Sequence, residues 1–149
     1  MKKILVTTDL SENSERAFPI VEKLAKQFDS EVTVLAVVED PAQIALVTVM
    51  DQPLVYGPDI QKEIIGNIKK DLDKLSDKYL EGIKHECVVT EGDSAQKRIL
   101  EYAEEKAVDL IVMATQGKTG VKHWILGSVT EKVSRQASCP VLLVPPRKS

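Results

Sequence analysis

The letters GKT stand at Gly117, Lys118 and Thr119, and they match the end of the phosphate-binding motif G-x-x-x-x-G-K-[ST]. The first glycine of that motif would stand at position 112, but this residue is Val112, within the apolar run DLIVMAT. A strand that is still extended at this point cannot turn around a phosphate. The GKT letters therefore do not indicate a Walker A loop.

A second possible phosphate site begins at Gly127 and Ser128, which precede the helical pattern SVTEKVSRQA. The first turn of a helix presents unpaired N–H groups and a partial positive charge, and a glycine lets a phosphate approach the backbone. The same residues also fit a capping box, with Ser128 as N-cap and Glu131 three residues later. The residues alone favour the cap over the phosphate, although the two roles are compatible. Gly117 and Gly120 also fit ordinary turn glycines.

The elements that would position these residues follow from the apolar pattern. Apolar runs alternate with helical patterns from end to end, which is typical of a parallel sheet built from right-handed βαβ units. We expect a single α/β domain over residues 1–149, with an open five-stranded parallel sheet and helices on both faces. The expected strands are 2–8, 31–38, 83–90, 109–115 and 140–145, and the expected helices are 12–28, 59–81, 94–106 and 128–137.

The strand 83–90 carries Lys84, His85 and Glu86, and this polarity indicates a sheet edge. The pattern favours the strand order 3-2-1-4-5, in which the winding reverses between the first and fourth strands. Ligands of open α/β sheets bind at the carboxyl ends of the strands at such a reversal. The stretches TTDLSE and ATQGKTGVKHWILGS are therefore the places to look for a site. The segment 40–58 fits either a lid or an irregular packing loop.

The composition limits the partners of the chain. Its 149 residues include 20 Lys and Arg against 23 Asp and Glu, a net charge of −3. This balance gives no electrostatic reason to expect nucleic acid or an anionic membrane as a partner. The N-terminal apolar run is too short for a signal peptide, and no run reaches the roughly 18 apolar residues of a membrane span. We therefore expect a cytoplasmic protein.

No group of residues has the spacing of a metal site. His85 lies on the expected edge strand and His123 in a loop, and neither has a second ligand nearby in the sequence. Cys87 and Cys139 match no metal or redox spacing, and we expect two buried thiols. Trp124, the only tryptophan, fits a loop anchor better than a base-stacking residue. No metal site is predicted.

The chain resembles the universal stress protein family, whose ATP-binding pattern is G-x-x-G, nine residues, then G-[ST]. The chain has Ala114-x-x-Gly117, nine residues from Lys118 to Leu126, then Gly127-Ser128, so three of the four motif positions fit. The resemblance covers the whole chain: ILVTTDLSE, LAVVED, EGDSAQKRILEYAEEKAVDLIVMAT and GSVTEKVSRQASCPVLLVP are similar to successive parts of the family sequence.

The resemblance implies a Rossmann-like, adenine nucleotide alpha hydrolase-like fold that binds ATP, with or without Mg²⁺. Asp9, with Thr8 beside it, would contact the nucleoside, although a cap on the next helix is an equal alternative. Val37 would line the adenine pocket, although its residue type alone fits a buried strand valine. The remaining residues implied are Met113 and Ala114 beside the base and ribose, and Gly117, Gly127, Ser128, Val129 and Thr130 at the phosphates.

Ala114 departs from the family pattern, because it replaces the first glycine of the motif. Alanine adds one methyl group and loses easy access to positive φ. Affinity for ATP would therefore fall if the site needs either close ribose approach or a left-handed backbone. The intact spacing from Gly117 to Gly127 still favours binding.

Three functions are compatible with these residues: an ATP-binding stress-response module, a slow ATP hydrolase and a ligand-free dimeric scaffold. The glycine spacing favours the first. A hydrolase needs a base or water-positioning group and metal-binding carboxylates. Glu131 is explained as a cap, and the fourth strand ends in Ala114-Thr115 without a carboxylate. We therefore predict no catalytic residues, and turnover of ATP that is slow or absent.

The last expected strand, 140–145, carries no charge and would lie at the open edge of the sheet. Monomers usually protect such an edge with lysines, bulges or central prolines, whereas Pro140 and Pro145 only bracket this strand. Cover by a terminal segment or by the loop around Trp124 is the alternative. The resemblance also implies pairing through this strand. We expect a two-fold homodimer in which the two copies of 140–145 run antiparallel.

Overall fold

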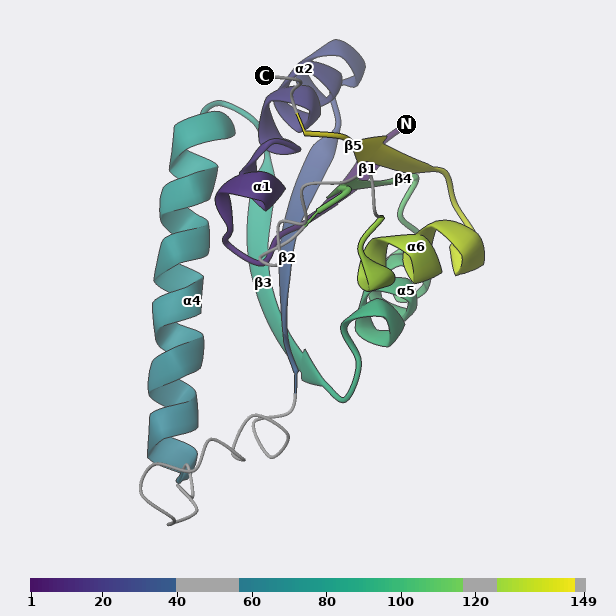
Figure 1. Cartoon of the computed structure of the whole chain (residues 1–149). Helices are drawn as coiled ribbons and strands as arrows, with labels where there is room; N and C mark the ends of the chain where they lie inside the picture. The colour runs from purple at the N-terminus through teal and green to yellow at the C-terminus, as the bar shows by residue number, and fades with distance from the viewer. Residues whose placement is uncertain (40–56, 117–125, 147–149) are drawn as a thin grey trace.

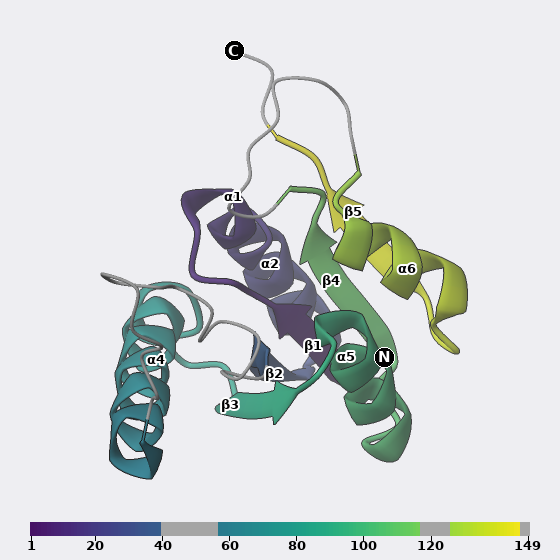
Figure 2. The same cartoon turned by 60° about the horizontal axis from the view of Figure 1, so that its bottom comes forward.

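The computed structural model describes residues 1–39, 57–116 and 126–146. In this part of the chain, five strands form a parallel sheet in the order β3-β2-β1-β4-β5 (Figures 1 and 2). The strands are Lys3–Thr7 (β1), Glu31–Glu39 (β2), His85–Gly92 (β3), Leu110–Ala114 (β4) and Val141–Val144 (β5). The predicted fold class and strand order are confirmed, and β3 lies at the predicted edge.

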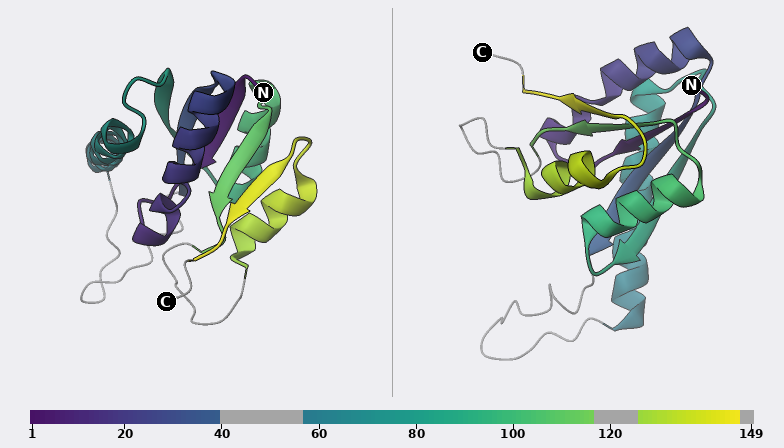
Figure 3. Two further views of the ribbon diagram at one scale, coloured as in Figure 1. Left: turned by 90° about the horizontal axis from the view of Figure 1, so that it is seen from above. Right: turned by 90° about the vertical axis from the view of Figure 1, so that its right-hand side faces the viewer.

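Helices cover both faces of this sheet (Figure 3). One face packs against α2 and α4, where Phe18 and Leu72 contact the cluster that contains Ile4 of β1. The other face packs against α5 and α6, where Ile99 and Val133 belong to the cluster of Leu5. The helices are Glu12–Glu15 (α1), Phe18–Phe28 (α2), Pro58–Tyr79 (α4), Ala95–Glu105 (α5) and Ser128–Gln136 (α6).

The central strand β1 is buried on both faces because successive side chains of a strand point in opposite directions. Ile4, Leu5 and Val6 are each no more than 1% exposed. On the edge strand β3, by contrast, His85 and Glu86 are exposed. Continuous apolar residues and polar edge residues are thus sorted as the sequence predicts.

The expected helix over 12–28 is two helices, and the prediction of one helix is wrong. α1 ends at Glu15, and α2 begins at Phe18 with Pro19 in its first turn. Proline lacks an N–H group, and its ring clashes with the carbonyl four residues before it in a continuing helix. In the first turn of a new helix neither problem arises. Pro19 therefore explains why the helix restarts.

Two further expectations need correction. Gly127, not Ser128, is the N-cap of α6, and Ser128 is the first helical residue, so the predicted capping box does not form. Cys87 and Cys139 are only partly buried, because Cys87 lies on the edge strand and Cys139 lies two residues before β5. Partial burial still raises the pKa of both thiols.

Among the residues that the structure describes, no helix is long and apolar enough to cross a membrane.

Candidate functional site

A cavity of about 320 Å³ lies where the sequence predicts a site, at the carboxyl ends of β1, β2 and β4. Nine of the ten predicted site residues line it, and Gly117 lies outside the described residues. Thr8 and Asp9 follow β1, and Val37 lies on β2. The others are Met113 and Ala114 at the end of β4, and Gly127, Ser128, Val129 and Thr130 at the start of α6.

The start of α6 forms one wall of this cavity. The Gly127 N–H donates to the Thr115 carbonyl at 3.0 Å, and the Gly127 carbonyl accepts from the Glu131 N–H at 2.9 Å. These two bonds explain why the helix is capped at Gly127. The next three N–H groups, at positions 128–130, belong to the first turn and have no acceptor within the helix. The wall therefore offers hydrogen-bond donors and the positive end of the helix dipole.

Neither the backbone conformation nor the described neighbours of Gly127 require a glycine at this position. Its φ is −58°, a value that any residue adopts. A Cβ built at this position would meet the Thr115 carbonyl oxygen at 3.5 Å, which is ordinary van der Waals contact. Neither backbone strain nor crowding by the described residues explains the glycine. A molecule that closely approaches the start of α6 would explain it.

Ala114 and Thr130 join β4 to α6. The Thr130 hydroxyl, in a side chain that is 6% exposed, donates to the Ala114 carbonyl at 3.2 Å. Ala114 belongs to an extended strand, and the non-glycine residues with positive φ in the described chain are Leu10, Asp29 and Ala107. Alanine at position 114 therefore causes no left-handed strain. Only its added methyl group bears on ligand affinity.

Another part of the lining is apolar and ends at a strand edge with which no described strand pairs. Leu35, Val37, Ile99 and Met113 line the cavity here, and Val37 is partly buried against the core on the α5 and α6 face. β2 extends to Glu39, whereas β1 ends at Thr7.

In the described chain, the backbone bonds from the β1 side to β2 end with the Thr8 N–H and the Leu35 carbonyl, 3.0 Å apart. Because backbone groups alternate in direction along a strand, the Val37 N–H and C=O point the same way as those of Leu35. Val37 thus presents a donor and an acceptor beyond the end of β1.

The loop after β1 holds Asp9 at the edge of the cavity. Oδ1 of Asp9 accepts from the N–H of Ser11 at 3.0 Å and from its hydroxyl at 2.5 Å. The N-cap of α1 is Ser11, whose hydroxyl accepts from the Ser14 N–H, so the alternative role of Asp9 as the cap is wrong. Asp9 instead shapes the turn that leads to the cap.

Several residues that line the cavity were missed from the sequence. Ser14 comes from α1, and Ala95 and Ile99 come from the first turns of α5. The spacing of Ala95 and Ile99 predicts that they share one face of a helix. It does not show that this face extends beyond the ends of the strands and lines the cavity. Ser14 stands three residues after Ser11, which is the spacing between an N-cap and the N–H that it accepts from. This spacing was the signal in the sequence that could have placed Ser14 near the site.

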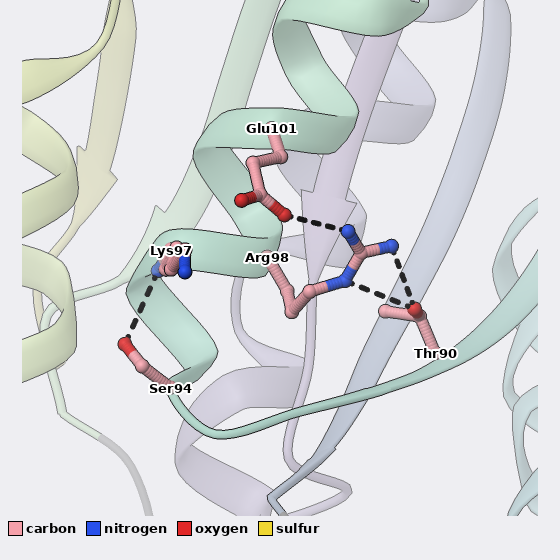
Figure 4. Close-up of polar contacts among 5 residues, drawn as sticks. All are labelled: Thr90, Ser94, Lys97, Arg98 and Glu101. Atoms are coloured by element: carbon pink, nitrogen blue, oxygen red, sulfur yellow. Dashed lines mark hydrogen bonds and ion pairs between the residues drawn. The ribbon is translucent and has the colours of Figure 1, made fainter.

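A polar cluster around Arg98 fixes α5 in this position (Figure 4). Arg98 Nε and Nη2 donate to the Thr90 hydroxyl at 3.3 and 3.0 Å, and Nη1 donates to Glu101 at 2.6 Å. The stem of Arg98 crosses Gly92, where an added Cβ would lie 2.4 Å from Arg98 Cγ. Ser94 caps the helix by accepting from the Lys97 N–H. These contacts tie the start of α5 to the end of β3.

A larger hollow, of about 570 Å³, lies near the amino ends of the strands. Its charged side chains include Lys26, paired with Glu22, and Lys84, paired with Glu31. The described residues that line it include neither the first turn of a helix nor the end of a strand beyond its neighbour, both of which line the smaller cavity. The chemistry therefore favours the smaller cavity as the functional site.

Two ionisable groups outside the lining of that cavity, Glu15 and Tyr102, have shifted pKa values. Hydrogen bonds from Lys78 and Tyr79 lower the pKa of Glu15, and this contact ties α1 to α4. Burial raises the pKa of Tyr102 on α5. The described residues contain no cluster of three or more potential metal ligands, and His85 is exposed with Nδ1 2.8 Å from the Ile83 carbonyl. His123 and Trp124 lie outside the described residues.

Residues 1–145 match the family model described as the universal stress protein family. The chain belongs to this family. Universal stress protein MJ0531 of Methanocaldococcus jannaschii is 38% identical over 143 residues, which cover 96% of this chain and 81% of that protein. Universal stress protein YxiE of Bacillus subtilis is 36% identical over 149 residues, and the match covers 95% of this chain and 97% of that protein.

Solved structures share the universal stress protein fold. That of the hypothetical protein MJ0577 has a TM-score of 0.81 and 28% identity, and the match covers 99% of this chain and 98% of that one. A universal stress protein in complex with cAMP has a TM-score of 0.64 at 20% identity. A family protein from Arabidopsis thaliana with AMP bound has a TM-score of 0.63 at 18% identity. The last two likenesses show the fold alone.

Proposed function

We propose that this universal stress protein binds ATP in the 320 Å³ cavity as a regulatory, stress-response module of the cytoplasm. The observation that carries the proposal is the convergence of three unlike features on this one cavity. These are an apolar wall with an unpaired strand edge, the Asp9 carboxylate and the start of α6. They suit a base, a sugar and a phosphate chain, in that order along the cavity.

The phosphate chain would lie on the first turn of α6. Backbone N–H groups at positions 128–130 and the helix dipole favour an anion. Gly127, which its own surroundings do not require, leaves room for a close approach to the backbone. Mg²⁺ would then arrive with the nucleotide, bound mainly through the phosphates.

The base would lie against Val37 and Met113. The Val37 N–H and C=O form a donor and acceptor pair, and the Watson–Crick edge of adenine offers a matching acceptor, N1, and donor, the 6-amino group. Guanine presents an acceptor and a donor in the opposite order on the same edge. A site built to hydrogen-bond one pattern rejects the other strongly, because its own groups are left unpaired. This pairing supports adenine over guanine.

The proposal predicts selective stabilisation by ATP. A ligand that binds only the folded state raises the free energy of unfolding by mass action, by about 2.7 kcal/mol at 100 times its Kd. A thermal-shift titration should therefore show a higher Tm with millimolar ATP and a much smaller rise with GTP. Gly127→Val, which fills the space at the start of α6, should abolish the rise, whereas Gly66→Ala on the open side of α4 should keep it. A wild type with no ATP-dependent rise would remove the proposal.

We further propose that two copies pair through β5. This strand lies at the sheet edge opposite β3 (Figure 2). The side chain of Leu142 on this strand is 37% exposed. The Ile111 N–H bonds to the Pro140 carbonyl and the Thr115 N–H to the Val144 carbonyl, so even-numbered residues point their backbone groups toward β4. By alternation, the backbone groups of Val141 and Leu143 face the edge at which no other described strand pairs with β5.

A charge at Leu142 tests this pairing with little effect on the core. Leu143 packs against the α5 and α6 face, whereas Leu142 is the exposed member of the pair. Around a two-fold axis, Leu142→Lys would bring two like charges together and should give a monomer in light scattering at micromolar concentration. Leu142→Met is the matched apolar control and should remain a dimer. A monomeric wild type would contradict the pairing.

A further inference from the structure

The loop between β1 and α1 contains three hydroxyl groups in one network of hydrogen bonds, which runs through the backbone of Ser11 and Ser14 and reaches Asp9. The Ser11 hydroxyl accepts from the Ser14 N–H at 3.2 Å and donates to Asp9 Oδ1. The Ser14 hydroxyl lies 2.8 Å from both the Ser11 carbonyl and the Thr8 hydroxyl. The Thr8 hydroxyl in turn accepts from the Leu10 N–H at 3.0 Å. Each of the three hydroxyl groups thus has more than one partner.

The direction of these hydrogen bonds is fixed by one carbonyl. A carbonyl oxygen only accepts, so the Ser14 hydroxyl donates its single proton to the backbone carbonyl of Ser11. The proton between Thr8 and Ser14 must therefore belong to Thr8. This leaves the Thr8 hydroxyl with no proton for a ligand. The Ser11 hydroxyl donates its own proton to Oδ1 of Asp9.

The loop is shaped by these side chains against the preference of its backbone. Leu10 has a φ of 63°, a left-handed conformation that residues with a side chain adopt only when neighbouring contacts enforce it. Thr8 and Ser14 are 7% and 4% exposed, and burial strengthens a satisfied network of hydrogen bonds. The Ser11 hydroxyl therefore holds the Asp9 carboxylate directly, and the Ser14 hydroxyl holds the backbone of Ser11.

We propose that Ser11 and Ser14 are positioning residues of the nucleotide site, which aim the Asp9 carboxylate at the sugar hydroxyl groups of the nucleotide. The inference rests on the proposed ATP-binding function. Ser11 acts directly, through two donors on Oδ1, and Ser14 acts by orienting Ser11. The carboxylate accepts from the ribose, so the site distinguishes ATP from its 2′-deoxy or 3′-deoxy analogue.

The test is a double-mutant cycle on ATP affinity, measured by titration calorimetry on the full chain. Ser11→Gly removes the hydroxyl, and glycine is the substitute that disturbs a helix N-cap least. We expect Ser11→Gly to weaken ATP binding about tenfold, an effect of about 1.4 kcal/mol. In an Asp9→Asn background the same change should have little further effect, because residues that act through one another are not additive.

Further variants separate positioning from a merely structural role. Ser11→Thr keeps the hydroxyl and should restore both the affinity and the discrimination between ATP and its deoxy analogues. Ser14→Ala should repeat the non-additivity with Asp9→Asn, and it carries the test if Ser11→Gly does not fold. Ser134→Ala removes an exposed hydroxyl that bonds the Glu131 carbonyl, and it is the control that should leave the Kd unchanged.

The outcomes are distinct. A wild type that binds no ATP overturns the proposed function and the inference with it. A wild type that binds ATP overturns the inference alone in either of two cases. The first is that the serine variants weaken binding equally in both backgrounds or not at all. The second is that ATP and both deoxy analogues bind with the same affinity.

Discussion

At the scale of single residues, hydrogen bonds from a few neighbours hold the carboxylates of Asp9 and Asp109. Asp9 is held by the N–H and hydroxyl of Ser11, and Asp109 by the N–H groups of Lys2 and Lys3 at 2.7 and 2.9 Å. The bonds to Lys2 and Lys3 lower the pKa of Asp109. This carboxylate joins the start of β1 to the start of β4, the two strands between which the winding reverses.

Asp109 predicts a pH-dependent contribution to stability. A folded-state pKa below the ordinary value of 3.8 means that the carboxylate stabilises the fold above that pH and loses this effect as the pH falls through the folded pKa. Asp109→Asn should therefore be less stable than wild type in urea at pH 7. The difference should shrink as the pH falls below 3.8. Asp77→Asn, on the exposed side of α4, is the control, and an equal loss of stability at every pH would contradict the assignment.

At the scale of elements, the apolar periodicity predicted every strand of the described sheet and its order. Each strand has a strong local pattern, and the polar residues Lys84, His85 and Glu86 mark the edge. The ends of the helices were harder to predict, because they depend on contacts made across loops. Gly127 is the N-cap because its N–H bonds to Thr115 at the end of β4, and no local pattern encodes that bond.

The same distinction applies to the site. Topology predicted where the cavity lies, and the resemblance gave nine residues that line it. Ser14, Ala95 and Ile99 were missed because they come from helices whose reach past the sheet is a property of packing. The role that we propose for Ser11 was not predicted for a different reason, since a serine before a helix is explained by capping alone.

The end of α5 offers a prediction at this scale. Ala107 has a φ of 51°, and the Val108 N–H bonds to the Ala103 carbonyl, as in a Schellman motif, where glycine is preferred. Ala107→Gly removes a left-handed strain of about 1–2 kcal/mol and adds unfolded-state entropy of about 0.4–1 kcal/mol. The variant should gain about 0.5–1 kcal/mol, seen as a Tm higher by a few degrees.

The same substitution at the end of α6 is its control. Ala137 has an extended backbone, with φ −64° and ψ 139°, so glycine relieves nothing there. Ala137→Gly should lower the Tm, because the unfolded chain gains freedom and the packing of Ala137 against the core is lost. Equal effects of the two substitutions would show that Ala107 carries no strain.

At the scale of the whole molecule, the cavity joins the two halves of the fold. Asp9 belongs to the first βα unit, and the start of α6 belongs to the last, so a bound nucleotide would connect them through contacts with both. The contacts proposed for the phosphates are backbone N–H groups at the start of a helix. Such contacts stabilise the bound substrate about as well as the transition state, and uniform binding does not raise kcat.

We therefore predict that ATP is bound far more readily than it is turned over. Fast phosphoryl transfer needs a positioned water or base together with a clamp of positive charge on the phosphates. The hydroxyl groups of Thr8 and Thr130 already donate to Ser14 and to the Ala114 carbonyl, so neither has a proton to give to the reacting phosphate. Purified protein saturated with ATP and Mg²⁺ should release phosphate well below about 1 per second, the lower end of ordinary enzyme rates. Gly127→Val should abolish binding without changing the background rate of release. If the wild type were faster than this and Gly127→Val removed the activity, the cavity would be an active site and not a regulatory one.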